Sequence, residues 1–297
     1  MLGRRRTEPR IIIKPAGIYP RLCGSYLAFF WFSIMLVTGC ATPGARLSET
    51  AEAHGFSLAA IDTGRYKLIV YLALRHDADE QPLHVYFSGD GTPWMQGRYP
   101  AADPSPRHAL ALRLMALDPA PSLQLNRPCY GHETMPEVCD PALWTYGRYS
   151  DQVVEAMSRG LDTARTRLGA NKLVLIGYSG GGTLARLVAQ RRDDVLALVT
   201  IAANLDHRRW TAHHQYLPLT RSLDPTTLLP LPSTILQWHL VGGHDHIVPA
   251  AVTRAGIRRE SAAEIRVFTE FNHRCCWEQI WPQILAELRL ALIRVGR

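Results

Sequence analysis

The chain has 297 residues, a length that suits one large domain or two small ones. Apolar residues make up 47% and charged residues 20%, so the chain can bury a sizeable core and is not intrinsically disordered. Residues 1–39 carry +5 of the formal net charge of +7, which leaves only +2 for the rest of the chain. This distribution excludes the basic footprint of a nucleic-acid-binding domain.

The front of the chain, residues 1–39, has the pattern of an export signal. A basic stretch precedes an apolar run at residues 22–37, which is short for a membrane span. Gly39 stands directly before Cys40, and a small residue before a cysteine at this place resembles the bacterial lipoprotein box. Cys40 would then be lipidated and become the mature N-terminus, with residues 40–54 as a tether between membrane and domain. The alternatives are a signal anchor and a secretory signal with a coincidental cysteine.

The residue after Cys40 bears on the choice of membrane. Ala41 stands where an aspartate retains lipoproteins at the inner membrane in enterobacteria-like sorting. Its presence favours the outer membrane of the cell envelope, facing the periplasm or the surface.

Four cysteines follow the predicted signal and Cys40: Cys129, Cys139, Cys275 and Cys276. In an exported protein these can pair, and Cys129 and Cys139 flank a short loop that a disulfide could close. The adjacent pair Cys275 and Cys276 would need a strained ring, so free thiols or a cross-link to the other loop stay open. Metal binding is the weaker interpretation because no CxxC or HxxxH spacing appears.

From residue 55 onward the chain predicts one domain of alternating strands and helices. Residues 56–75 indicate two strands joined at Thr63-Gly64, and residues 82–94 a third strand that runs into a glycine turn. Residues 104–119 have helical spacing and the stretch from Ser122 is a weaker strand. A clear amphipathic helix then begins near Ser150 and ends at Gly169.

The second half continues the alternation. The run KLVLIGYSG is apolar on both faces, as expected of a central parallel strand. A helix, a strand and an irregular segment at residues 207–232 follow, and then a strand, a helix, a last strand and a final helix from about Trp277. The pattern predicts a largely parallel sheet with antiparallel strands at its front edge. The irregular segment is predicted to be an insertion or lid.

The stretch GYSGGGT at residues 177–183 places four glycines around one serine. A phosphate-binding loop needs a lysine after its last glycine, and here Thr183 follows Gly182 directly. A dinucleotide fingerprint fails because Ser179 occupies the second glycine position. The pattern G-x-S-x-G of a nucleophile elbow does fit, with a glycine-rich turn kept only for close packing as the alternative.

A serine nucleophile needs a base and an orienting carboxylate. Asp245 and His273 each follow a predicted strand, and the order Ser179, Asp245, His273 is the one expected of this architecture. Asp206 is the rival acid. His244 and His246 flank Asp245, where either could be a surface residue, and His273 is preferred over them as the base.

The developing oxyanion also needs donors. Gly180 offers one backbone N–H by position, and the glycine turn SGDG predicts the second from Asp90 or Gly91. The alternative for this segment is an ordinary tight turn.

Together the motifs FSGDGTPW, GYSGGG, GGHDHIVP and FNHRCCW resemble the α/β-hydrolase superfamily, and within it bacterial lipoprotein-type members, over about residues 55–295. The resemblance implies an eight-stranded, mostly parallel sheet with helices on both faces and a lid after the sixth strand. It also implies serine hydrolase chemistry on carboxylic esters or related acyl compounds, like that of esterases and lipases. One departure is the GDG turn, where many esterases carry HGGG or HG.

The sequence therefore predicts a cell-envelope enzyme that cleaves a small acyl substrate without a metal or organic cofactor, and with no nucleic-acid partner. Trp210 and Tyr216 in the insertion suit an apolar group of that substrate. The alternatives are a non-catalytic envelope lipoprotein that uses the fold for binding, and a peptidase or acyltransferase with the same three residues.

Overall fold

The computed structural model describes residues 41–73 and 81–295, with the side chain of residue 295 excepted. The predicted signal of residues 1–39 and the lipidation candidate Cys40 lie outside the described residues. Among the helices that are described, none is long and apolar enough to cross a membrane.

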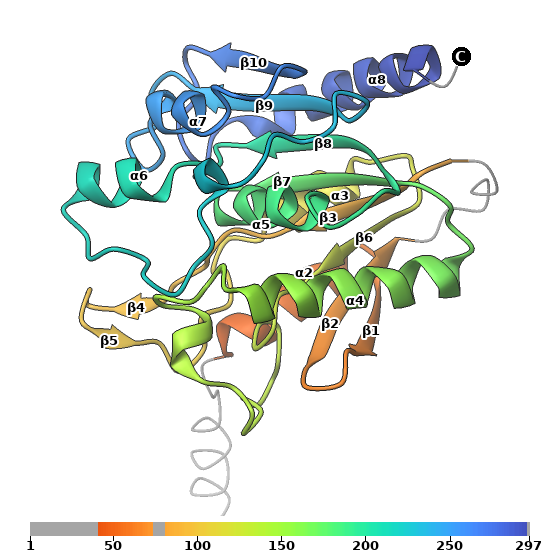
Figure 1. Ribbon diagram of the computed structural model, residues 1–297. Helices are drawn as coiled ribbons and strands as arrows, with labels where there is room; N and C mark the ends of the chain where they lie inside the picture. The colour runs from red at the N-terminus through yellow and green to blue at the C-terminus, as the bar shows by residue number, and fades with distance from the viewer. Residues whose placement is uncertain (1–40, 74–80, 296–297) are drawn as a thin grey trace, which may run out of the picture. The chain divides into compact units, whose positions relative to one another are not determined.

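Eight strands form the main sheet (Figure 1). They are β1 (Ser57–Asp62), β2 (Lys67–Ala73), β3 (Leu83–Phe87), β6 (Ser122–Leu125), β7 (Leu173–Tyr178), β8 (Val195–Ile201), β9 (Leu236–Gly242) and β10 (Ala263–Phe268). Their spatial order is β1-β2-β6-β3-β7-β8-β9-β10. The pairs β1–β2 and β2–β6 are antiparallel and all later pairs are parallel, which confirms the predicted mostly parallel sheet with an antiparallel edge.

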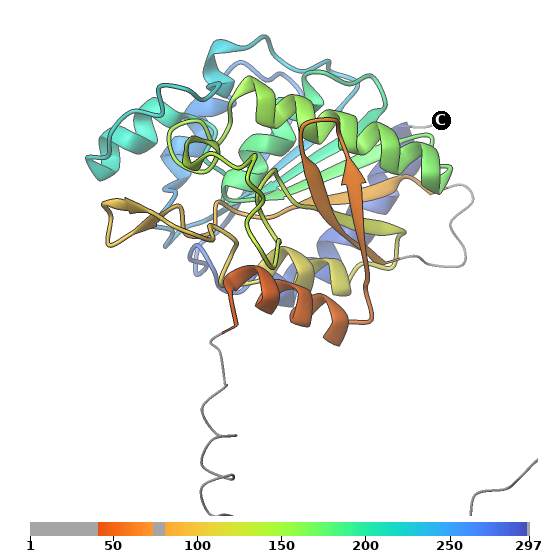
Figure 2. The same cartoon turned by 90° about the horizontal axis from the view of Figure 1, so that it is seen from below.

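Helices cover both faces of this sheet (Figure 2). On one face lie α4 (Asp151–Leu168) and α5 (Gly180–Ala189), and on the other lie α2 (Pro43–Ala53), α3 (Leu110–Ala116) and α8 (Trp277–Val295). Each face buries its own apolar cluster against the sheet, so β3 and β7 contribute buried side chains to both. Burial on both faces explains why these strands are apolar throughout.

The sequence predicts α4 well because its boundaries are encoded locally. Ser150 occupies the N-cap position, and Gly169 ends the helix in the left-handed conformation with φ of 66°. Val153, Met157 and Leu161 recur at helical spacing and are buried against the sheet.

Residues 43–53, part of the predicted tether, differ from the expectation because they form helix α2. Thr42 caps this helix by accepting a hydrogen bond from the Ala45 N–H, with Pro43 at the first helical position. Leu47 and Ala51 are buried, so the segment is packed onto the domain. Short, small and polar residues suggested a tether, but two apolar residues one helical turn apart suffice to dock it.

Two further segments lie at the carboxyl ends of the parallel strands. The first is a hairpin that the sequence did not predict, formed by β4 (Trp94–Met95) and β5 (Tyr99–Pro100). The second is the expected insertion after β8, the sixth strand of the main sheet, which holds α6 (His207–His214) and the 3₁₀ turn η2 (Pro225–Thr227). The short 3₁₀ turn η1 (Pro141–Leu143) and the helix α7 (Ala250–Gly256) complete the elements.

Candidate active site

The turn between β7 and α5 holds Ser179 in an unusual backbone conformation, with φ of 53° and ψ of −125°. A non-glycine residue at positive φ is strained, and such strain is concentrated at functional sites. The neighbouring glycines make the turn possible. A Cβ on Gly177 would strike the backbone of Gly181 and Gly182, and one on Gly181 would strike the carbonyl oxygens of Phe87 and Ser88.

The carboxyl ends of the parallel strands bring the three predicted residues of the reaction together. Ser179 follows β7, Asp245 follows β9 and His273 follows β10. The Ser179 Oγ lies 3.1 Å from His273 Nε2, and His273 Nδ1 lies 2.8 Å from Asp245 Oδ2. The hydroxyl, imidazole and carboxylate thus form one continuous hydrogen-bonded chain.

His273 and Asp245 are fixed by their own partners. The His273 carbonyl accepts hydrogen bonds from the Tyr178 hydroxyl and the Trp277 indole N–H, each at 3.1 Å. The other carboxylate oxygen of Asp245 accepts from the backbone N–H of Ile247 and Val248, both at 2.8 Å. Asp245 is 3% exposed and His273 8% exposed, so water competes little for these bonds.

The rival residues are placed elsewhere. Asp206 caps α6 by accepting a hydrogen bond from the Arg209 N–H at 2.9 Å. His244 and His246 are exposed on either side of the buried Asp245. The geometry therefore joins Asp245, not Asp206, to His273.

The predicted donors for an oxyanion lie where the turn after β3 meets the start of α5. Gly180 is the first residue of α5, and Asp90 adjoins it so closely that a Cβ on Gly180 would overlap the Asp90 carboxylate. Within the described residues, neither the Gly180 N–H nor the Asp90 N–H donates a hydrogen bond. Gly91, the other candidate, has φ of 66° and turns the chain against Pro104.

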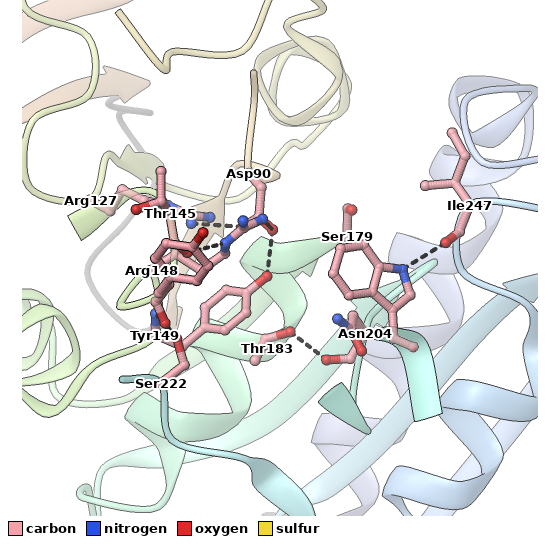
Figure 3. Close-up of polar contacts among 12 residues, drawn as sticks. Asp90, Arg127, Thr145, Arg148, Tyr149, Ser179, Thr183, Asn204, Ser222 and Ile247 are labelled. Carbon is pink, nitrogen blue, oxygen red and sulfur yellow. Dashed lines mark hydrogen bonds and ion pairs between the residues drawn. The ribbon is translucent and has the colours of Figure 1, made fainter. Parts of the chain in front are cut away.

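The side chain of Asp90 is the centre of a buried polar cluster that the sequence did not predict (Figure 3). Arg127 donates to Oδ1 at 2.8 Å, and Oδ2 accepts from Arg148 at 3.0 Å and from the Tyr149 hydroxyl at 2.5 Å. The Asp90 carbonyl also accepts from the Tyr130 hydroxyl at 3.0 Å. All four of these donors lie in residues 126–149, the connection between β6 and α4. Their hydrogen bonds to Asp90 hold the turn after β3 in place.

The charges of this cluster explain its protonation. Burial raises the pKa of Asp90, but Arg148 and Arg127 together with the Tyr149 hydrogen bond outweigh it and lower that pKa to about 2. Burial and the Asp90 charge raise the pKa of Tyr149 well above its ordinary value, so the hydroxyl stays a donor. One carboxylate and two guanidinium groups leave a net positive charge beside the Gly180 N–H.

Further polar residues contact Tyr149 and the start of α5. His207 stacks on Tyr149 with ring centroids 4.7 Å apart, and burial lowers its pKa to about 4. Thr183 in α5 donates to the Asn204 carbonyl at 2.6 Å, a contact drawn beside Ser179 in Figure 3. This bond ties the start of α5 to the chain that leaves β8.

A cavity of about 750 Å³ opens above Ser179 and His273. The glycine turn, the β4–β5 hairpin and the insertion after β8 line it. Its apolar part includes Trp94, Tyr146, Trp210, Leu219 and Ile247. The Trp210 indole donates to the Ile247 carbonyl at 2.8 Å, which fastens the insertion to the loop that carries Asp245. The cavity is large enough for a small organic substrate.

The structure pairs the four described cysteines in two bridges. Cys129 pairs with Cys139, the local disulfide that the sequence predicted. Cys275 pairs with Cys276, so the cross-link between the two loops, one of the open alternatives, does not form. Within the described residues, no group of three or more His, Cys, Asp or Glu side chains is arranged to hold a metal ion.

Part of the chain is also similar to a known protein family. Residues 122–228 match the family model described as the alpha/beta hydrolase fold, a range that includes Ser179 but not Asp245 or His273. No curated protein matches the chain.

Solved structures match over most of the chain at low identity. A proline iminopeptidase-related protein from Thermus thermophilus is 15% identical, with a TM-score of 0.58, over 81% of this chain and 99% of its own. Alpha/beta hydrolase domain-containing protein 10 from mouse is 13% identical, with a TM-score of 0.57, over 80% and 99%. Est1E from Butyrivibrio proteoclasticus with bound ferulic acid is 12% identical, with a TM-score of 0.60, over 80% and 99%.

These similarities concern the fold alone. The order of the strands and the helices on both faces of the sheet show the same fold without any comparison. The chain has the α/β-hydrolase fold.

Proposed function

We propose that the protein is a serine hydrolase that cleaves a carboxylic ester or related acyl bond. The observation that carries this proposal is the continuous hydrogen-bonded chain from Ser179 through His273 to Asp245 at the floor of a cavity. A serine that only packs a turn has no need of a buried imidazole and carboxylate in line with it.

The reaction follows from these contacts. The Ser179 Oγ attacks the acyl carbonyl carbon while His273 Nε2 takes its proton, and the Asp245 carboxylate stabilises the imidazolium that forms. His273 returns the proton to the leaving alcohol oxygen as the bond to carbon breaks, which leaves an acyl-serine. Water, deprotonated by His273, then attacks the acyl carbon and releases the acid and the free serine.

The oxyanion of each tetrahedral intermediate is stabilised by the N–H groups of Gly180 and Asp90. Two features support this assignment: Gly180 begins α5, where the helix dipole is positive, and the turn of Asp90 adjoins it. The net positive charge of Asp90, Arg127 and Arg148 adds to the same field.

Active-site labelling tests the proposal. A fluorophosphonate probe is expected to form a covalent adduct with the folded wild-type chain, and Ser179→Ala is expected to abolish it along with at least a ~10⁴-fold loss of kcat. 4-Nitrophenyl esters of graded chain length and matched peptide amides identify the bond that is cleaved. Absence of a Ser179-dependent adduct would refute an enzyme and favour the non-catalytic alternative, whereas a preference for amides would favour a peptidase.

We further propose that the domain is anchored in the cell envelope, at the outer membrane, through a lipid on Cys40. The supporting observations are the apolar run before Gly39-Cys40 and the alanine at position 41. Palmitate labelling in cells is expected to disappear in Cys40→Ser, and fractionation is expected to place the label in the outer membrane. Labelling that survives the substitution contradicts the anchor.

A further inference from the structure

The charges that line the active-site cavity are unevenly distributed. Among the described residues, four arginines line it, Arg98, Arg107, Arg148 and Arg274, against one acidic residue, Asp90. Arg127 and Arg148 occupy both oxygens of that carboxylate. The chain after residue 39 carries a net charge of only +2, so this excess is a property of the cavity rather than of the domain.

Three of these arginines are available to a ligand. Arg98, Arg107 and Arg274 are exposed, and within the described part of the chain none of them forms an ion pair with a carboxylate. Arg107 donates to the Thr92 hydroxyl at 3.3 Å, which orients its guanidinium group at the cavity wall. Arg98 lies over the Tyr99 ring at 5.6 Å.

The surroundings of His108 show the same excess. Burial and the charges of Arg274 and Arg113 lower the pKa of this cavity residue. Arg113 has its own partner, Glu278, at 2.6 Å. Arg274, which directly follows His273 in the chain, lines the same cavity as His108 and forms no ion pair with any described carboxylate.

Cations in such a setting attract anionic ligands. Guanidinium groups bind carboxylates and phosphates through paired hydrogen bonds. Apolar walls such as those of Trp94, Tyr146 and Leu219 concentrate the field inside the cavity, because their dielectric constant is low.

On the basis of the proposed hydrolase function, we propose that the substrate is an acyl ester that combines an apolar part with an anionic group, a carboxylate or a phosphate, bound by Arg98, Arg107 and Arg274. The apolar part fills the side of the cavity formed by the aromatic and aliphatic residues. The anionic group selects the substrate, and Ser179 cleaves the ester bond.

Two matched sets of esters test this inference. In the first set, 4-nitrophenyl esters of a seven-carbon acyl chain end in a carboxamide, a carboxylate or a phosphate monoester. In the second set, butanoate esters of a phenol carry the same three groups on the alcohol. At 20 mM salt, kcat/KM for an anionic member is expected to exceed that for the neutral carboxamide about 10-fold in at least one set, and 0.5 M NaCl is expected to shrink this preference. The carboxylate and phosphate members show which anion is preferred.

Variants connect the preference to the named residues. Arg107→Gln and Arg274→Gln are each expected to lower the anion preference about 3-fold, and the triple variant with Arg98→Gln is expected to remove it. Arg167→Gln is the matched control, an exposed arginine in the last turn of α4 that does not line the cavity. The control is expected to keep the wild-type preference.

The possible failures are distinguishable. If the carboxamide esters are cleaved as well as the anionic ones in both sets, or if Arg167→Gln lowers the preference as much as the cavity variants, the inference is overturned and the hydrolase stands. If no ester is cleaved and no fluorophosphonate adduct forms on Ser179, the proposed function fails and the inference fails with it.

Discussion

Two turns meet at the candidate site, and they are held in place by different means. The elbow around Ser179 depends on glycines within three residues of it, because a Cβ on any of them would overlap neighbouring atoms, which are backbone atoms at Gly177 and Gly181. The turn of Asp90 is held by side chains from far along the chain, with Arg127 37 residues away and Tyr149 59 residues away.

The difference concerns how each turn can fail. A side chain at one of these glycine positions either fits or clashes, so a single substitution disrupts the whole elbow. A charged cluster distributes its support over several hydrogen bonds, so the Asp90 turn can lose one contribution at a time. The following predictions test this contrast, beginning with the largest effect.

Gly181→Ala is expected to damage the elbow as a whole. Its Cβ would overlap the carbonyl oxygens of Phe87 and Ser88, which are backbone atoms of the neighbouring strand and turn. We expect a loss of several kcal/mol in the free energy of unfolding and at least a ~10³-fold loss of ester hydrolysis. Gly55→Ala is the control, because its Cβ meets no atom and only the φ of 73° costs about 1–2 kcal/mol. Equal effects of the two substitutions would contradict the steric argument.

Asp90→Asn is expected to weaken the second turn by leaving two buried guanidinium groups without a carboxylate. The side chains of Arg127 and Arg148 are 1% and 6% exposed, so the loss is expected to be about 3–5 kcal/mol in unfolding free energy. The loss of kcat is expected to be ~10²-fold, since the oxyanion donor moves with the turn.

Tyr149→Phe gives the graded version of that experiment. It removes only one hydrogen bond to the carboxylate, worth about 1.5–3 kcal/mol, and is expected to fold and to lose ~10-fold in kcat with little change in KM. Tyr66→Phe, a buried tyrosine bonded to Gln152, is the control for stability alone. An unchanged kcat in both Asp90→Asn and Tyr149→Phe would show that the cluster does not support the reaction.

The disulfide between Cys129 and Cys139 is expected to support the same turn indirectly. It closes a loop with a sequence separation of 10, next to Tyr130 and close in sequence to Arg127. The double variant Cys129→Ser/Cys139→Ser is expected to lose about 3 kcal/mol of stability, measured by denaturant unfolding, because the unfolded chain gains freedom. Reduction of the wild type, which also opens the Cys275–Cys276 bridge, should give at least this loss; a double variant as stable as the oxidised wild type refutes this role.

The smallest effect is expected from pH. Burial lowers the pKa of His207 to about 4, whereas the unfolded chain takes up that proton near pH ~6.5. The stability that depends on a neutral His207 is therefore present above pH ~6.5 and is lost as the pH falls toward 4. His207→Phe keeps a ring against Tyr149 and is expected to flatten the decline of stability in this window, compared with the exposed control His54→Phe. A decline as steep as that of the wild type would assign the effect to other groups.

Much of the fold was predictable because its signals are local. The caps of α4, the apolar strands β3 and β7 and the alternation of strands with helices all follow from residues near one another in sequence. The helix α2 was missed since its amphipathic pattern rests on only two buried residues, Leu47 and Ala51. The β4–β5 hairpin was missed because strands of two residues carry no periodicity.

The residues of the site also differ in whether local sequence signals predict them. Ser179, Asp245 and His273 were predictable as candidates since each follows a strand in the order that the fold requires, and the parallel sheet brings those strand ends to one edge. Arg127, Arg148 and Tyr149 carried one weak signal, two arginines on either side of a disulfide loop. That signal named no carboxylate partner.

What the sequence by itself determined was the elbow, because the four glycines beside Ser179 give the backbone the freedom that this turn needs and leave few alternatives. What only the tertiary structure decided was the environment of that serine: which acid faces His273, what holds the Asp90 turn, and which charges line the cavity. Ion pairs and cavity walls join residues at any separation along the chain, so no spacing rule can predict them, and they become visible only once the chain has folded.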